Sequence, residues 1–174
     1  MASLFGMALG GWMSGAIFDA ARAHRGPVSL ILLDIDYFKK FNDTYGHQVG
    51  DKVLVSIAHL IKSVLRTSDI LARYGGEEFV IALPGTTGDT AMLIAERMRV
   101  KVEEELAAQV DVPEPVTISL GVATYSDTLE TSQRLIRAAD KALYQSKHAG
   151  RNRVTRAPDT ATRVIKLPRG AEKH

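Results

Sequence analysis

Residues 75–79 read Gly-Gly-Glu-Glu-Phe and lie between two short apolar segments, 70–74 and 79–83. Both segments have the composition of β-strands, so the glycines and acids are expected at the tip of a hairpin. Glycine at such a tip permits positive φ and lets a ligand approach the backbone closely. The acids Glu77 and Glu78 begin the second strand at that same tip.

A second group of acids begins at Asp34 and follows an apolar run, from Val28 to Leu33, that is broken only by Ser29. The run is typical of a buried central strand that delivers carboxylates at its C-terminal end. If this strand and the second hairpin strand are antiparallel neighbours, Asp34 and Glu77 converge on one point. Hard divalent cations take oxygen ligands, and Mg²⁺ uses one or two carboxylates with phosphates and water. The alternative is that these acids are ordinary solvated residues at strand ends.

Composition restricts the class of protein. A chain of 174 residues that is 45% apolar is long enough for one domain with a proper core. The formal net charge is only +2, and the excess of basic residues is local to 151–174, which carries seven basic and two acidic side chains, so we expect no nucleic-acid partner. The absence of cysteine excludes disulfides and thiolate metal sites and fits a reducing cytoplasm, which is the expected location.

The first 18 residues contain no charged side chain. Glycine and serine dilute their hydrophobicity, and no basic residues lead them, so we expect neither a signal peptide nor a membrane span. The expected role of this segment is to pack on its own domain or to dock an upstream module.

Periodicity predicts four helices and five strands. The helices are expected over 14–24, 51–65, 90–106 and 132–148, and the strands over 28–33, 69–73, 79–83, 116–123 and 153–155. This order predicts one sheet with helices packed against its faces.

From about Val28 to Val154 the chain resembles the GGDEF family of diguanylate cyclases. The resemblance rests on ordered blocks at 34–39, 42–47, 50–51, 73–79, 119–123 and 139–144, followed by Lys147, Gly150, Arg151 and Asn152. It implies an α+β fold, a single palm-like nucleotidyl cyclase domain with a mostly antiparallel five-stranded sheet. We expect that domain over 13–156, with an atypical leading segment over 1–12 and a mobile tail over 157–174.

The resemblance also implies an activity. A diguanylate cyclase condenses two GTP molecules into cyclic di-GMP by 3′-oxygen attack on the α-phosphate and releases two pyrophosphates. Each protomer of a homodimer holds one GTP, with Mg²⁺ or Mn²⁺ as cofactor, two ions per site. Catalysis of this type is mostly positioning and electrostatics.

Site residues follow from the resemblance, position by position. The metal ligands would be Asp34, the carbonyl of Ile35, and Glu77. The catalytic residues would be Lys39 and the pair Glu77 and Glu78, either of which could accept the proton of the 3′-hydroxyl. The substrate-binding residues would be Phe38, Lys39, Asn42, His47, Asp51, Gly75, Gly76, Lys147 and Arg151.

Asp51 is the residue that argues for guanine. A carboxylate accepts hydrogen bonds from the N1–H and 2-amino group of guanine, whereas adenine offers no such pair. The alternative for Asp51 is an N-cap of the helix that follows it.

Arg66 and Asp69, ahead of the hairpin, resemble the family's inhibitory product site, with Arg73 as a helper. Arginine suits phosphate and guanine edges, so cyclic di-GMP is the implied inhibitor. The alternative is a solvated surface pair at a helix end.

One segment departs from the family. Its members usually enter the domain through Asp-x-Leu-Thr-Gly-Leu-x-Asn-Arg-Arg, and residues 2–11 here lack the acid, threonine, asparagine and both arginines. This difference affects coupling to an upstream sensor module, which we expect outside this chain. Two rival functions stay open: a non-catalytic receptor for GTP or cyclic di-GMP, and a cyclase that makes an adenine-containing dinucleotide.

Overall fold

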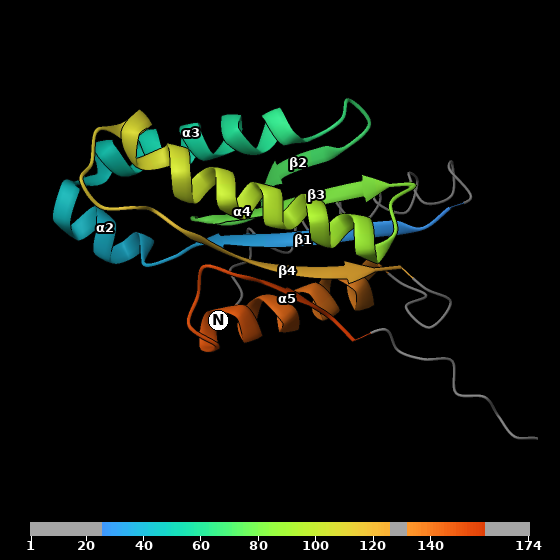
Figure 1. The fold of residues 1–174 in the computed structure, drawn as a ribbon. Helices are drawn as coiled ribbons and strands as arrows, with labels where there is room; N and C mark the ends of the chain where they lie inside the picture. The colour runs from blue at the N-terminus through green and yellow to red at the C-terminus, as the bar shows by residue number, and fades with distance from the viewer. Residues whose placement is uncertain (1–25, 126–131, 159–174) are drawn as a thin grey trace, which may run out of the picture.

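The computed structural model describes residues 26–125 and 132–158. In these residues a five-stranded sheet has the order β2-β3-β1-β4-β5 (Figure 1). The strands are β1 (Val28–Ile35), β2 (Ile70–Arg73), β3 (Glu78–Pro84), β4 (Ile118–Thr124) and β5 (Val154–Arg156). The helices are α2 (Phe38–Tyr45), α3 (His47–Val64), α4 (Gly88–Val110) and α5 (Ser132–His148).

The sheet is mostly antiparallel, with β1 at its centre. β1 pairs antiparallel with β3 on one side and with β4 on the other, while β2 pairs antiparallel with β3. Among the strand pairs of residues 26–125 and 132–158, only β4 and β5 are parallel. All eight residues of β1 are buried, because the strand has neighbours on both edges and helices on both faces. This position explains why six of its eight residues are apolar, with Ser29 and Asp34 as the buried polar exceptions, and it confirms the expected α+β fold.

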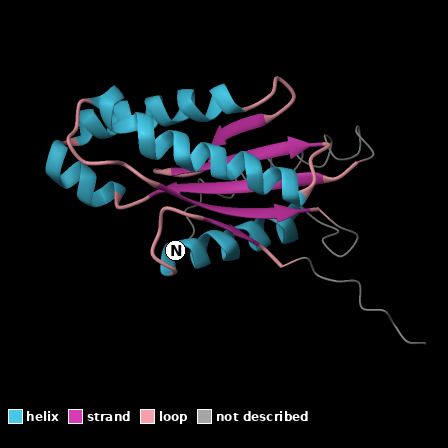
Figure 2. Ribbon diagram, in the orientation of Figure 1, coloured by secondary structure: helices cyan, strands magenta, loops and turns pink. Residues whose placement is uncertain are grey.

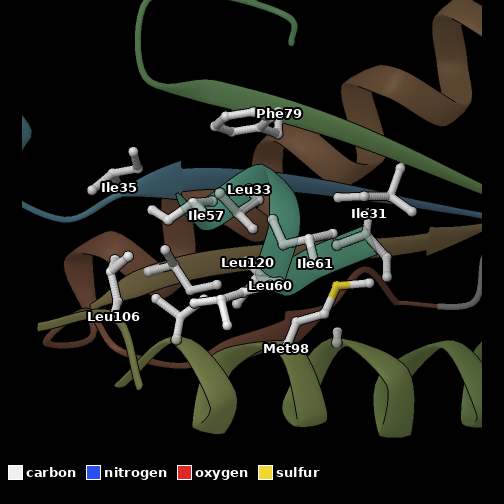
Figure 3. Close-up of a cluster of buried hydrophobic side chains, with 14 of the residues drawn as sticks. Ile31, Leu33, Ile35, Ile57, Leu60, Ile61, Phe79, Met98, Leu106 and Leu120 are labelled. Atoms are coloured by element: carbon white, nitrogen blue, oxygen red, sulfur yellow. The ribbon is translucent and has the colours of Figure 1, made fainter. Parts of the chain in front are cut away.

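Helices cover the two faces of the sheet separately (Figure 2). On one face α3 and α4 pack side chains such as Ile57 and Met98 against Ile31 and Leu33 of β1, in the larger part of the core (Figure 3). On the other face α5 packs Leu135, Ala139, Ala142 and Leu143 against Leu30, Leu32 and Val80. Alternate residues of β1 therefore belong to different halves of the core.

Gly121 of β4 fixes how closely α5 approaches the sheet. A Cβ there would lie 2.2 Å from the Ala139 carbonyl oxygen and 2.2 Å from the Leu143 nitrogen. Both are backbone atoms that cannot turn aside, so the glycine allows direct contact between helix and strand.

The predicted elements are confirmed with shifted ends, except in two places. The helix expected over 14–24 lies outside the described residues, as do the whole leading segment over 1–12 and the tail beyond 158. The short helix α2 was not expected, because eight residues give too little periodicity to detect. None of the helices in the described ranges is long and apolar enough to cross a membrane.

α3 begins at His47, four residues before the predicted start. Gly46, with φ of 84°, joins it directly to α2 and stands at its N-cap. Asp51 therefore lies inside the helix, and the alternative that it caps α3 is wrong.

Candidate active site

Asp34 and Glu78 lie opposite each other at one end of the sheet. They are partners in the antiparallel register of β1 and β3, so their side chains point to the same face. One residue away, the Ile35 N–H donates to the Glu77 carbonyl over 3.3 Å. The two strands are thus the antiparallel neighbours that the sequence suggested, and they bring Asp34 beside the two hairpin acids.

Lys147 completes this group from the last turn of α5. Its Nζ lies 2.6 Å from Oδ2 of Asp34. Asp34 is buried, with only 4% of its surface exposed. Burial raises the pKa of Asp34, and the hydrogen bond and charge of Lys147 oppose that rise. The lysine is thus the main counter-ion of the buried acid.

Negative charge accumulates around this point. Burial raises the pKa of both Glu77 and Glu78, and the nearby charge of Asp34 raises each further. Lys147 lowers the pKa of both glutamates but only partly offsets the repulsion. Such clustering of like charges is typical of functional sites.

The acids fit a hard divalent cation. Their donors are oxygens, as Mg²⁺ and Mn²⁺ prefer, and an added positive charge would relieve the repulsion that raises their pKa values. Within 26–125 and 132–158, no three His, Cys, Asp or Glu side chains form a ready cage. A cation held here would therefore need further oxygens, which substrate phosphates and water supply.

The hairpin tip is held by backbone contacts and one arginine. The N–H groups of Tyr74 and Gly75 donate to the Glu78 carbonyl, over 2.8 and 3.2 Å. Arg73 donates from Nε to the Gly75 carbonyl (3.1 Å) and from Nη2 to the Gly76 carbonyl (2.6 Å). Arg73 therefore stabilises the hairpin, a role that its sequence position did not suggest.

The hairpin glycines do not use the positive φ that glycine permits. Neither Gly75 nor Gly76 is among the described residues with positive φ. A Cβ at Gly75 would lie 2.5 Å from Oε2 of Glu78, whereas one at Gly76 would meet no atom of the described residues within 4 Å. Gly75 thus leaves room for Glu78, and Gly76 leaves its backbone open on that side.

A buried amide oxygen marks a second region, where α2 meets α3. Oδ1 of Asn42 is buried and has no hydrogen-bond partner among the described residues. Gly50 leaves room for it, since a Cβ there would lie 1.8 Å from that oxygen. His47 and Asp51 are exposed on the first turns of α3. An unpartnered buried acceptor is costly unless a ligand satisfies it, so this region fits a base that carries hydrogen-bond donors.

Two residues at the start of α2 differ in what they can offer a ligand. The Phe38 side chain is buried in the core, so only its backbone N–H at the helix start can reach a ligand. Lys39 is exposed in the same turn. Free N–H groups at a helix start bind phosphate oxygens.

The structure also identifies residues to which the sequence assigned no role. Asp36 is buried and accepts hydrogen bonds from Oγ1 of Thr117 (2.8 Å), Oγ of Ser119 (2.7 Å) and the Asn152 N–H (3.0 Å). The two acids separated by one residue at the end of β1 therefore differ: Asp34 pairs with Lys147 beside the hairpin acids, whereas Asp36 ties the end of β1 to β4 and to the turn after α5. Asn152 follows Arg151 among the residues that carry the family resemblance, and this was the one feature of the sequence that could have pointed to it.

A separate groove of about 780 Å³ contains Arg66 and Asp69. The Arg66 N–H donates to Oδ2 of Asp69 over 2.8 Å, which fixes the turn between α3 and β2. From α4 the groove adds Arg97 and Lys101, which sequence reasoning missed. Arg73 does not line it, since its guanidinium bonds the hairpin instead.

Comparisons with known proteins agree with this geometry. The family model for "Diguanylate cyclase, GGDEF domain" matches residues 15–153. Diguanylate cyclase A from Treponema denticola is 50% identical over 128 residues, which cover 74% of this chain and 34% of that protein. The chain thus spans about a third of the length of this curated relative.

Solved structures share the fold. The active GGEEF domain of a Vibrio cholerae diguanylate cyclase has a TM-score of 0.75 and 36% identity, covering 83% of this chain and 92% of that one. The GGDEF domain of DgcB from Caulobacter crescentus, in complex with c-di-GMP, has a TM-score of 0.76 and 36% identity, covering 87% and 89%. The match to the family model over most of the chain and the identity to these relatives show that the chain belongs to the GGDEF diguanylate cyclase family.

Proposed function

We propose that the protein is a diguanylate cyclase that condenses two GTP molecules into cyclic di-GMP and two pyrophosphates. The observation that carries the proposal is the juxtaposition of Asp34, the hairpin acids and Lys147 at the C-terminal end of β1. The diguanylate cyclases among its relatives support it.

The acidic residues and the basic residues have different roles at the triphosphate. Asp34, Glu77 and the carbonyl of Ile35 would hold Mg²⁺ or Mn²⁺, two ions when nucleotide is bound, which supply positive charge to the reacting oxygens. Lys147 and Arg151 bind the triphosphate from the C-terminal end of α5, and Lys39 and the backbone of Phe38 bind it from the start of α2.

One of the hairpin glutamates accepts the proton of the 3′-hydroxyl. The raised pKa of Glu77 and of Glu78 makes each a better proton acceptor than an ordinary carboxylate. Gly76, whose missing Cβ leaves open space, lets the hairpin backbone approach the nucleotide.

The base binds where α2 meets α3. Asp51 accepts the N1–H and 2-amino hydrogens of guanine, and the unpartnered Oδ1 of Asn42 offers a further acceptor. His47 lies in the same helical turn as Asp51. Donors on guanine have no counterpart at the same edge of adenine, which supports GTP over ATP.

The product requires two protomers. One domain holds one nucleotide, and cyclic di-GMP joins two, so the reaction takes place between two antiparallel copies of the chain. The groove of Arg66, Asp69 and Arg97 binds cyclic di-GMP as an inhibitor, through arginine contacts to phosphate and guanine. The DgcB complex with c-di-GMP supports a product site in this family. We keep a reducing cytoplasm as the proposed location.

Incubation of the purified chain with GTP and Mg²⁺, over a range of protein concentrations, tests the proposal. Cyclic di-GMP, detected by mass after chromatography, should form at a rate that rises faster than linearly with protein concentration. An Asp34→Asn variant at the same concentrations is the control. GTP binding without product at any concentration would instead support the receptor function.

A further inference from the structure

The turn that follows α5 has an unusual backbone. Gly150, Arg151 and Asn152 all have positive φ, of 114°, 63° and 45°. Residues other than glycine rarely adopt this conformation, and it persists where surrounding contacts hold it. Arg151, one of the proposed triphosphate ligands, is in the middle of this turn, so the contacts that hold the turn also place Arg151.

Asn152 holds the turn in place with hydrogen bonds from both its main chain and its side chain. Its N–H donates to Oδ2 of Asp36 over 3.0 Å. Its Oδ1 accepts from Nη1 of Arg99 (2.8 Å), and its Nδ2 donates to Oε1 of Glu103 (2.7 Å). The turn is thereby tied to α4 and to the end of β1 together.

The side chain of Arg151 is held by the residue next to Asp36. Its guanidinium lies over the Tyr37 ring, 4.3 Å from the centroid, and Nη1 is 3.2 Å from the Tyr37 hydroxyl. Tyr37 itself has a φ of 56° and is 61% exposed, so its ring contributes little to the core. An exposed aromatic in a disfavoured backbone conformation suggests a role beyond packing.

Arg151 belongs electrostatically to the acidic site. Its charge lowers the pKa of Asp34, against the effect of burial. Free arginine side chains lose rotamer freedom when they bind phosphate, and a guanidinium already held in place loses less.

We propose that Asp36 and Tyr37 are positioning residues for Arg151. Asp36 fixes the backbone of the turn through Asn152, and Tyr37 holds the guanidinium at the open end of the site, ready for the nucleotide's triphosphate. This inference rests on the proposed function, in which Arg151 contacts that triphosphate.

A double-mutant cycle between Tyr37 and Arg151 tests the side-chain contact. The probes are the α,β-methylene analogue of GTP with Mg²⁺, and GMP, which lacks the terminal phosphates; calorimetry gives the Kd of each. Arg151→Ala should raise the Kd of the analogue by about tenfold or more and leave the Kd of GMP unchanged. Tyr37→Ala should raise the Kd of the analogue by about threefold or more. Tyr37→Phe, which keeps the ring, should recover most of the lost affinity.

The decisive result is the double variant. When Arg151 is already alanine, Tyr37→Ala should have no further effect on the analogue. A matched control is Tyr144→Ala, which removes another exposed tyrosine (60%), stacked on His148 at 3.8 Å, and should leave binding of the analogue unchanged. Equal losses from Tyr37→Ala with and without Arg151 would overturn the positioning role.

The Asp36 contact is tested through Asn152. Asn152→Gly and Asn152→Ala both remove the side-chain bonds, but only alanine resists the positive φ that keeps the N–H on Asp36. Asn152→Ala should therefore reduce the affinity for the analogue more than Asn152→Gly does, and only when Arg151 is present. Thermal unfolding of each variant shows whether the fold is intact. Equal affinity of both variants and the parent for the analogue would refute the role of the contact between Asn152 and Asp36.

The two proposals fail in different ways. If Arg151→Ala leaves the analogue's affinity unchanged, the triphosphate contact is absent and the positioning role is refuted with it. If Arg151→Ala weakens binding but the Tyr37 and Asn152 variants do not, the proposed function stands and the positioning role alone is wrong.

Discussion

Asp34 of β1 lies directly opposite Glu78 of β3, on the sheet face that α5 covers. Lys147 of α5 reaches Asp34 over 2.6 Å, and burial together with the charge of Asp34 raises the pKa of Glu78. The arrangement is unfavourable for folding in isolation, since one lysine cannot neutralise several acids that share a partly buried site. Its persistence is best explained by function.

We expect Asp34→Asn to reduce cyclic di-GMP formation by about 100-fold or more while the fold stays intact, because the amide cannot replace a charged metal ligand. Product formation and circular dichroism measure the two effects. Asp111→Asn, at the exposed C-cap of α4, makes the same chemical change away from the site and should have no effect. Near-normal activity of Asp34→Asn would contradict the metal assignment.

Glu78→Gln should stabilise the folded protein at neutral pH. The pKa of Glu78 is raised in the folded protein, so its charged carboxylate lowers the free energy of unfolding at pH values above that pKa. This destabilisation disappears as the pH falls below the ordinary pKa of 4.5, where the carboxyl is protonated in both the folded and the unfolded protein. The unfolding free energy of the variant, measured by urea denaturation, should therefore exceed that of the parent at pH 7 and approach it in acid.

Glu114→Gln, an exposed loop position, reports the general effect of removing one negative charge. A loss of stability in Glu78→Gln at pH 7 would show that the carboxylate makes a net favourable contact in the folded protein.

Two glycine substitutions separate packing from ligand approach. Gly121→Ala should lower the unfolding free energy by about 2 kcal/mol or more, because its Cβ would press on the backbone of α5. Gly76→Ala meets nothing within 4 Å and should leave stability unchanged, yet raise the KM for GTP if the hairpin backbone approaches the nucleotide. An unchanged KM would remove Gly76 from the substrate site.

Inosine triphosphate tests guanine recognition, since it differs from GTP only by the missing 2-amino group. The parent should bind GTP more tightly by about tenfold, and Asp51→Ala should reduce that preference to near unity, because the carboxylate accepts from the 2-amino group. Competition binding gives both values. Retention of the full preference in Asp51→Ala would place guanine recognition elsewhere.

The groove predicts inhibition by product. Arg66→Ala and Arg97→Ala should each raise the concentration of cyclic di-GMP that halves activity by about tenfold or more, with little effect on the initial rate. Arg137→Ala, an exposed arginine on α5, is the matched control. Arg73→Ala should instead affect the hairpin and hence the initial rate, because Arg73 bonds the Gly75 and Gly76 carbonyls.

The sequence determined most of the elements and the chemical inventory. A strand buried on both faces is mostly apolar, so the run from Val28 to Leu33, with Ser29 as its one polar residue, identified the sheet centre. The long helices α4 and α5 showed their buried faces as periodic apolar residues. The eight-residue α2 was too short for that signal.

Only the tertiary structure decided which of these residues meet. Lys147 pairs with Asp34, and Arg151 with Tyr37 at a separation of 114 residues, because α5 ends beside the C-terminal end of β1. Arg97 reaches the groove of Arg66, while Arg73 turns to the hairpin instead. Local patterns along a chain report burial and secondary structure, whereas such contacts depend on the packing of distant elements, which no local pattern encodes.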